Sequence, residues 1–239
     1  MIGSVSFAIL AAVANFVGGG LVAWRARGVH TALHVLTAFG AGFMLAVAIL
    51  EMLPGAMEVS GGLTTVLVGY LAVHLTQHVL TPHFHFGEET HAEAMVSRGI
   101  GVWALLGLIP HSFFDGVAIS GGFLISRDLG ALVVTAVLLH KVPTGISLAS
   151  IMLASGNTRR QALVAVGVVG LATVLGAVVT PIVGPLAQHG LGLAAGVTIY
   201  VAASNLIPES QREPGWMVPG GVFLGVAAFY LSRLFLPEG

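Results

Sequence analysis

The sequence predicts an all-α integral membrane protein with eight transmembrane helices, and three observations support this. Hydrophobic residues make up 56% of the 239-residue chain and charged residues only 8%. The mean hydropathy is +0.97. Soluble domains carry about 25% charged residues, so this chain has too few polar side chains to cover a water-exposed surface. The apolar residues also form long continuous runs, which favours helices over the short alternating strands of a membrane barrel.

Charged residues and Gly or Pro breaks divide the chain into apolar spans within a single transmembrane domain, residues 1–239. A helix needs about 20 apolar residues to cross the hydrocarbon, or about 30 residues with its connection, so the length allows about eight spans. The third expected span is only just long enough. The 33 glycines and many alanines would let neighbouring helix backbones approach closely. The expected spans are 4–23, 33–53, 63–80, 99–121, 129–154, 161–180, 191–207 and 217–236.

The arginines predict the orientation of the chain. The first span has no basic residues before it and is followed by Arg25 and Arg27, which is typical of an uncleaved helix with its N-terminus outside. Cytoplasmic segments carry an excess of Lys and Arg, so we expect a multi-pass protein of the cell membrane with both termini outside. In this orientation six arginines lie inside and two outside: Arg25, Arg27, Arg98, Arg159, Arg160 and Arg212, against Arg127 and Arg233.

Composition and missing motifs exclude several function classes. The net charge is −1, so the chain has no basic field for nucleic acid. Because the chain has no cysteine, disulfides, thiolate metal sites and thiol catalysis are excluded. No GxxxxGK[ST] loop is present, so ATP is not expected to be the direct energy source. We expect the bilayer as the surrounding partner and no organic cofactor.

Two consecutive spans carry ionisable residues near their centres. Between Gly99 and Arg127 these are only His111 and Asp115; the next span has only His140 and Lys141. A charged side chain at the bilayer centre costs at least about 2.5–3.5 kcal/mol, and such residues normally mark an ion or proton path. A structural pair of buried ions is the alternative. Two such groups at matched depth favour the ion path.

The spacing of these residues suits a metal ion. In HSFFDG (111–116), His111 and Asp115 are four residues apart and share one face of a helix. In HKVPTG (140–145), Pro143 removes a backbone hydrogen bond and frees carbonyl groups near residue 139. An imidazole and a carboxylate can converge on a cation at about 2.0–2.2 Å. Two helices joined as a hairpin would therefore offer His111, Asp115 and His140 to one point.

These motifs resemble those of the ZIP (ZRT/IRT-like) family of divalent metal transporters. HSFFDG is similar to the family pattern H-N/S-x-x-E/D-G of the fourth helix, and HKVPTG to H-x-x-P-E-G of the fifth. EMLPGAM in the second helix and YVAASNLIPE in the seventh also resemble family patterns. The resemblance covers nearly the whole chain. It implies a ZIP-type bundle in which helices 1, 4, 5 and 6 move against helices 2, 3, 7 and 8.

The resemblance implies that His111, Asp115 and His140 form the transport site, with Met44 as a further ligand that some relatives supply. This chain departs from the pattern of the two-metal relatives at three positions, where those relatives have Asn or an acidic residue. Span 161–180 also has no acidic residue. A single-metal site is the expected consequence. The three departing residues are Ser112, Lys141 and Thr144.

Lys141 is a cation beside an expected cation site. One hypothesis is that its ammonium occupies the position of the missing second metal and pairs with Asp115 while the site is empty. The alternative is that Lys141 lies off the His140 face and extends to water or to a carbonyl group.

Three peripheral groups could also handle metal. Loop 81–98 is His-rich, which suits labile metal binding in the cytoplasm, with a merely solvated loop as the alternative. Two histidines at the inner end of the third span could relay metal to that loop, or be simply solvated. Two acids at the outer end of the second span could attract cations, or be ordinary helix-terminal acids. These residues are His83, His85 and His91 of the loop, His74 and His78 of the relay, and Glu51 and Glu58 of the outer end.

The function predicted is a secondary transporter that carries Zn²⁺ into the cytoplasm, with Fe²⁺, Mn²⁺ and Cd²⁺ as further substrates, and not an enzyme. Histidine with carboxylate suits these metals, whereas Mg²⁺ and Ca²⁺ prefer all-oxygen ligands. The alternative is an intramembrane hydrolase that uses Ser112, His140 and Asp115, or a catalytic zinc. A retinal protein with Lys141 as the Schiff base is a third, weaker reading. The oligomeric state stays open, with a homodimer as one candidate assembly.

Overall fold

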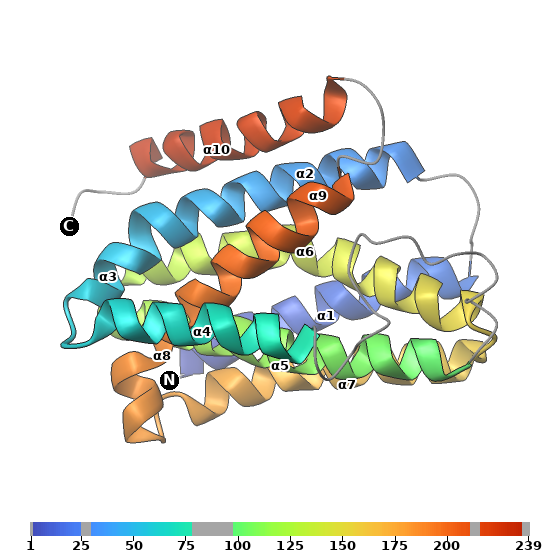
Figure 1. The fold of residues 1–239 in the computed structure, drawn as a ribbon, viewed down its shortest axis with the longest axis horizontal. Helices are drawn as coiled ribbons and strands as arrows, with labels where there is room; N and C mark the ends of the chain where they lie inside the picture. Colours follow the sequence, from blue (N-terminus) through green and yellow to red (C-terminus); the bar gives the residue numbers. More distant parts are fainter. Residues whose placement is uncertain (1, 25–29, 78–97, 211–215, 236–239) are drawn as a thin grey trace.

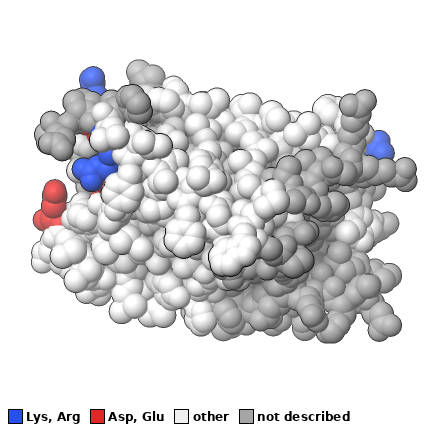
Figure 2. Space-filling view, turned by 90° about the horizontal axis from the view of Figure 1, so that it is seen from above, with Lys and Arg blue, Asp and Glu red and all other residues white. Residues whose placement is uncertain are grey.

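The structure is a computed structural model of the chain, described for residues 2–24, 30–77, 98–210 and 216–235. Within these ranges the chain forms helices and turns and no strand, which confirms the all-α prediction. Seven described helices are long and apolar enough to cross a membrane, and α4 is a shorter apolar helix. Figure 2 shows one face of the molecule, on which the coloured charged residues lie near the two ends and the described residues between them are uncharged.

The helices follow the order of the expected spans (Figure 1). Two π-helical segments, η1 and η4, continue α2 into α3 and α8 into α9. The seventh helical rod begins at Gly184, before the expected start at residue 191. The bounds are α1 Ile2–Trp24, α2 His30–Val47, η1 Ala48–Met52, α3 Leu53–Met57, α4 Gly62–Leu75, α5 Arg98–Ile125, α6 Arg127–Ala154, α7 Arg159–Val179, α8 Gly184–Tyr200, η4 Val201–Leu206, α9 Ile207–Ser210 and α10 Met217–Phe235.

A proline explains both η1 and η4. Pro54 and Pro208 have no N–H group, so each leaves the carbonyl four residues earlier without its helical partner. The residue before each proline donates instead to the carbonyl five residues back, from Leu53 to Ala48 and from Ile207 to Ala202. Such a wide turn lets a helix continue past a proline with a local change of direction.

Local sequence signals begin the two helices that follow α5. Ser126 caps α6, because its Oγ accepts a hydrogen bond from the Leu129 N–H at 3.1 Å. Thr158 and Gln161 form a capping box at the start of α7. Gly156 stands between these helices with φ +82°, a conformation that favours glycine. The short connections make α5, α6 and α7 consecutive antiparallel neighbours.

The helices divide into two groups of four by their contacts. The site bundle consists of α1, α5, α6 and α7, in which α1 packs on α6 and α7, and α5 packs on the same two helices. The flanking group consists of α2 with α10 and α4 with α8. Contacts of α5 with α8 and of α2 with α6 join the groups. This is the same division of helices that the family resemblance implies.

Reciprocal glycines bring the paired helices into backbone contact. In each of four pairs, a glycine faces the carbonyl that lies three residues before the glycine of its partner helix. A Cβ atom at any of these glycines would overlap that carbonyl oxygen, so no larger residue fits without moving a backbone. The glycine pairs are Gly18 with Gly145 (α1 and α6), Gly116 with Gly176 (α5 and α7), Gly42 with Gly225 (α2 and α10), and Gly69 with Gly196 (α4 and α8).

Replacing one of these glycines tests the packing. We expect Gly176→Ala to destabilise the protein by about 1–3 kcal/mol, because the added methyl group overlaps the Phe113 carbonyl of α5. The matched control is Gly167→Ala on the same helix, where a Cβ would meet no atom within 4 Å. Thermal melting in detergent measures both variants. Equal melting temperatures for the two would contradict the packing argument.

Candidate metal site

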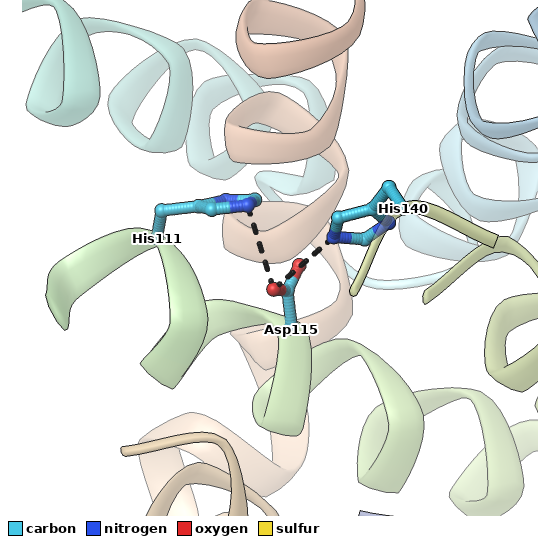
Figure 3. Close-up of side chains that lie close together, drawn as sticks. All are labelled: His111, Asp115 and His140. Carbon is cyan, nitrogen blue, oxygen red and sulfur yellow. Dashed lines mark hydrogen bonds and ion pairs between the residues drawn. The ribbon is translucent and has the colours of Figure 1, made fainter. Parts of the chain in front are cut away.

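Two neighbouring helices bring together the three side chains predicted as ligands. His111 and Asp115 come from α5, and His140 comes from α6 (Figure 3). Their ligand atoms all lie within 4.8 Å of one another, and they are the one group of this kind among the described residues. The three residues are at most 3% exposed. The hairpin geometry expected from the sequence therefore produces a buried cluster.

The two distances from Asp115 to the imidazoles match the ligand spacing of a zinc site. Asp115 Oδ2 lies 3.5 Å from His111 Nε2 and 3.4 Å from His140 Nε2. Tetrahedral zinc with bonds of about 2.0–2.1 Å holds its ligand atoms about 3.3–3.4 Å apart. Both imidazoles approach the same carboxylate oxygen, as the two dashed lines in Figure 3 show. A metal ion could bind among the three atoms with small side-chain movements.

A backbone carbonyl orients one of the two imidazoles. His140 Nδ1 lies 2.9 Å from the carbonyl oxygen of Ala136, one turn earlier on α6. When Nδ1–H donates to this carbonyl, the lone pair of Nε2 is left to face Asp115 and a metal ion. His111 Nδ1 is buried and has no hydrogen-bond partner within the described ranges. The α6 imidazole is therefore held more firmly than the one on α5.

Lys141 occupies the interior beside these ligands. Its side chain is fully buried, and its Nζ donates to Asp115 Oδ2 at 2.7 Å and to Ser112 Oγ at 2.9 Å. Pairing with Asp115, one of the two arrangements considered from the sequence, is therefore the one present. The same contact engages the Ser112 hydroxyl as an acceptor. Asp115 Oδ2 is thus the shared partner of three nitrogen atoms.

The backbone around Pro143 is supported by neighbouring groups. Thr144 Oγ1 donates to the His140 carbonyl at 2.8 Å, so its hydroxyl is already bonded within α6. The Leu139 carbonyl, which the proline deprives of its helical partner, faces Gly40 of α2. Both motif glycines are used at helix crossings, Gly116 against α7 and Gly145 against α1. The motifs therefore position the site as well as supply its ligands.

Met44 and the outer acids have separate surroundings. Met44 is buried on α2 in a core cluster that includes Val133 and Ala136 of α6. Glu51 forms an ion pair with Arg233 Nη1 at 3.2 Å, which links η1 to α10. Glu58 is exposed at the end of α3. Only Glu58 of the two acids thus remains exposed at this end without an ion pair among the described residues.

The other expected metal-handling residues lie mostly outside the described ranges. His74 is exposed on α4, with its ring edge-on to Tyr200 at a centroid distance of 5.8 Å. The relay partner His78 and the three loop histidines fall within residues 78–97, which are not described: His83, His85 and His91.

The structure adds two polar residues that sequence reasoning missed. Asn15 of α1 is fully buried, and its Nδ2 donates to the Val166 carbonyl of α7 at 2.9 Å. The sequence feature that could have indicated Asn15 is a polar amide side chain within an apolar span. His189 of α8 lines a cavity of about 150 Å³ between α3, α4, α5 and α8. Both residues lie at contacts between helices, and neither belongs to the cluster of His111, Asp115 and His140.

Fold and site together define a multi-pass membrane protein with a buried cluster suited to a divalent metal ion. Comparison with known proteins identifies the family to which the chain belongs. The family model for "ZIP Zinc transporter" matches residues 72–232, and the chain belongs to the ZIP zinc transporter family.

Individual relatives agree with this assignment. The chain is 28% identical to "Zinc transporter ZupT" of Enterobacter sp. (strain 638), over 95% of each protein. It is 27% identical to the ZupT protein of Escherichia fergusonii over the same shares. It is 34% identical to "Zinc transporter SLC39A7" of Canis lupus familiaris, over 56% of this chain and 30% of that protein.

The family assignment confirms several predictions. The chain is a membrane transporter of divalent metal ions and not an enzyme, and the resemblance based on HSFFDG and HKVPTG is correct. The hydrolase alternative is not favoured. The Ser112 hydroxyl accepts a hydrogen bond from Lys141, which does not prepare it as a nucleophile for His140.

The ion pair between Asp115 and Lys141 can be tested without metal. We expect Asp115→Asn to destabilise the metal-free protein by about 3–5 kcal/mol, because it leaves a buried ammonium without its counter-charge. The double variant Asp115→Asn/Lys141→Met should recover most of that loss. Melting in detergent with a chelator measures this. A double variant no more stable than Asp115→Asn alone would show that the pair is not coupled.

Proposed function

We propose that this protein carries Zn²⁺ into the cytoplasm through one mid-membrane site formed by His111, Asp115 and His140. The observation that carries the proposal is that two buried imidazole nitrogens lie 3.4–3.5 Å from a buried carboxylate oxygen, Asp115 Oδ2. These atoms come from the two motifs that relate the chain to ZIP transporters. The relatives named above are zinc transporters by name.

The ligand types support zinc and its chemical neighbours. Two imidazole nitrogens and one carboxylate oxygen form a borderline set that suits Zn²⁺, and Fe²⁺, Mn²⁺ and Cd²⁺ as further substrates. Mg²⁺ and Ca²⁺ prefer all-oxygen ligands and would bind poorly. Water completes a tetrahedral ion, or the thioether of buried Met44 does so from α2. An exchangeable fourth ligand is appropriate for an ion that must leave again.

A single metal site follows from what surrounds Asp115. Two-metal relatives supply polar or acidic ligands at the positions of Ser112, Lys141 and Thr144. Here a lysine ammonium lies against Asp115, a serine hydroxyl bonds that ammonium, and a threonine hydroxyl bonds the backbone. Helix α7 carries no acidic residue. A second divalent ion would have to displace Lys141 and would find no second carboxylate.

Inward transport has a physical basis in the membrane potential. An inside-negative potential stabilises each inward-moving elementary charge by about 2.3 kcal/mol per 100 mV, so a divalent ion gains about twice that. We infer that both termini lie outside, because the arginines are enriched on the opposite side. Alternating access then arises when the site bundle shifts against the flanking group. Exposed Glu58 stands at the outer end, where it could attract cations.

Uptake measurements test the site directly. We expect His111→Ala, Asp115→Ala and His140→Ala each to reduce uptake of radiolabelled zinc into proteoliposomes by at least about tenfold, since each loses one of three ligands. The matched control is His189→Ala, a histidine outside the cluster, which should transport like the parent protein. Parent-like uptake by the three ligand variants would contradict the proposed site.

Counting bound metal tests the single site. We expect the purified protein to bind one zinc ion per chain in the membrane interior, because Lys141 occupies the space beside Asp115. Metal analysis after removal of loosely bound ions measures this in the parent and in His140→Ala. Loss of one ion in the variant identifies the interior site. A second tightly bound ion that also depends on His140 would argue for a two-metal site.

A further inference from the structure

Lys141 is the only lysine in the sequence, and it lies fully buried near the middle of its span. A charged group in the middle of a membrane span is costly, so its presence calls for a compensating role. Its two hydrogen-bond partners, Asp115 and Ser112, both lie on the neighbouring helix α5. Neither contact is needed to hold a metal ion, because Lys141 supplies no lone pair as an ammonium.

The charges of the site differ between its empty and loaded forms. With neutral imidazoles, the Asp115 carboxylate and the Lys141 ammonium sum to zero in the empty site. Without the ammonium, the empty site would carry one uncompensated negative charge. A bound divalent ion brings its own positive charge to the carboxylate. The ammonium is therefore needed for charge balance only when the metal is absent.

The geometry makes the Lys141 ammonium and a metal ion compete for one atom, Asp115 Oδ2. Asp115 Oδ2 accepts from Lys141 Nζ at 2.7 Å, and the same oxygen faces both imidazole nitrogens that would bind the metal. A metal ion bound there coordinates the Asp115 oxygen to which the ammonium donates its hydrogen bond, and the positive charge of the metal repels the ammonium. Ser112 Oγ, at 2.9 Å, offers Lys141 a second partner within the site. The ammonium can thus loosen its contact with Asp115 without leaving the interior.

We propose that Lys141 is the internal counter-ion of the empty transporter. It allows the metal-free site to switch its access back from one side of the membrane to the other. The proposal rests on the proposed function, in which this site alternates between the two sides. A bare carboxylate would hold the empty site where water can reach it, because moving it through a dry interior is costly. The ion pair removes that cost. Lys141 is accordingly a positioning and charge-balancing residue, not a metal ligand.

This role affects one half of the transport cycle. Net uptake requires the empty site to return, whereas exchange of labelled for unlabelled zinc uses only the loaded form in both directions. Removing the ammonium should therefore slow net uptake and spare exchange. It should also lower the zinc concentration for half-maximal exchange, because the competitor at Asp115 is gone. A merely structural lysine would change net uptake and exchange together.

The test compares two kinds of proteoliposome over a range of external zinc concentrations. Labelled zinc uptake is measured into zinc-free vesicles for net uptake, and into vesicles preloaded with unlabelled zinc for exchange. For Lys141→Met and Lys141→Gln we expect the ratio of net uptake to exchange to fall at least about tenfold below that of the parent protein. Preloaded zinc should thus stimulate labelled uptake strongly in these variants.

A charge swap is the matched control. In Ser112→Lys/Lys141→Ser the ammonium reaches Asp115 from α5 instead of α6, across the present contact between Nζ and Oγ. We expect this swap to restore net uptake relative to exchange. If both neutral variants fail to fold, as judged by melting and size exclusion, the swap alone decides. Restored net uptake supports the counter-ion role, and lost net uptake with retained exchange overturns it.

The remaining outcomes separate this proposal from the proposed function. Equal changes in net uptake and exchange, or no change in either, overturn the counter-ion role while the zinc site stands. If the parent protein itself neither takes up nor exchanges zinc, the proposed function fails instead. The variant His111→Ala distinguishes these cases, because loss of a ligand should reduce net uptake and exchange alike.

Discussion

One carboxylate oxygen, buried at the middle of the helical spans, is the constraint on which the site depends. Asp115 Oδ2 is approached by His111 from its own helix and by His140 and Lys141 from α6. In a low-dielectric interior an unpaired carboxylate is costly, and the Lys141 ammonium at 2.7 Å compensates its charge. Under the proposed function, the same oxygen binds the metal ion once the ammonium withdraws, so one atom serves both charge balance and metal binding.

Helix packing gives that oxygen its neighbours. A contact across two helices needs both to hold a definite rotation and height, and reciprocal glycines set these at backbone distance. Gly116 fixes α5 against α7 next to Asp115, and Gly145 fixes α6 against α1 five residues after His140. The HSFFDG and HKVPTG motifs therefore combine ligands with the close crossings that hold them. This explains why each motif ends in glycine.

The two groups of helices carry different kinds of polar residue. The site bundle holds the interior ion pair and the imidazoles of His111 and His140, while the flanking group is joined at one end by the ion pair of Glu51 with Arg233. The π-helical turns before Pro54 and Pro208 lie in the flanking group, where they bend α2 and α8 past their prolines. The fully buried Asn15 instead ties α1 to α7 within the site bundle. Each group thus has polar contacts of its own.

The sequence alone determined the membrane class, the order of the helical spans and the three residues that meet in the buried His/Asp cluster. These are local or compositional properties: apolar runs select the membrane, and a spacing of four places His111 and Asp115 on one face of a helix. Tertiary structure decided the partner of Lys141, the bonding of Ser112, the pairing of Glu51 and the reciprocal glycines. Each of these joins residues far apart in the chain, and such contacts depend on the rotation and height of whole helices. Residue spacing does not encode those quantities, because they are set by how all the helices pack together.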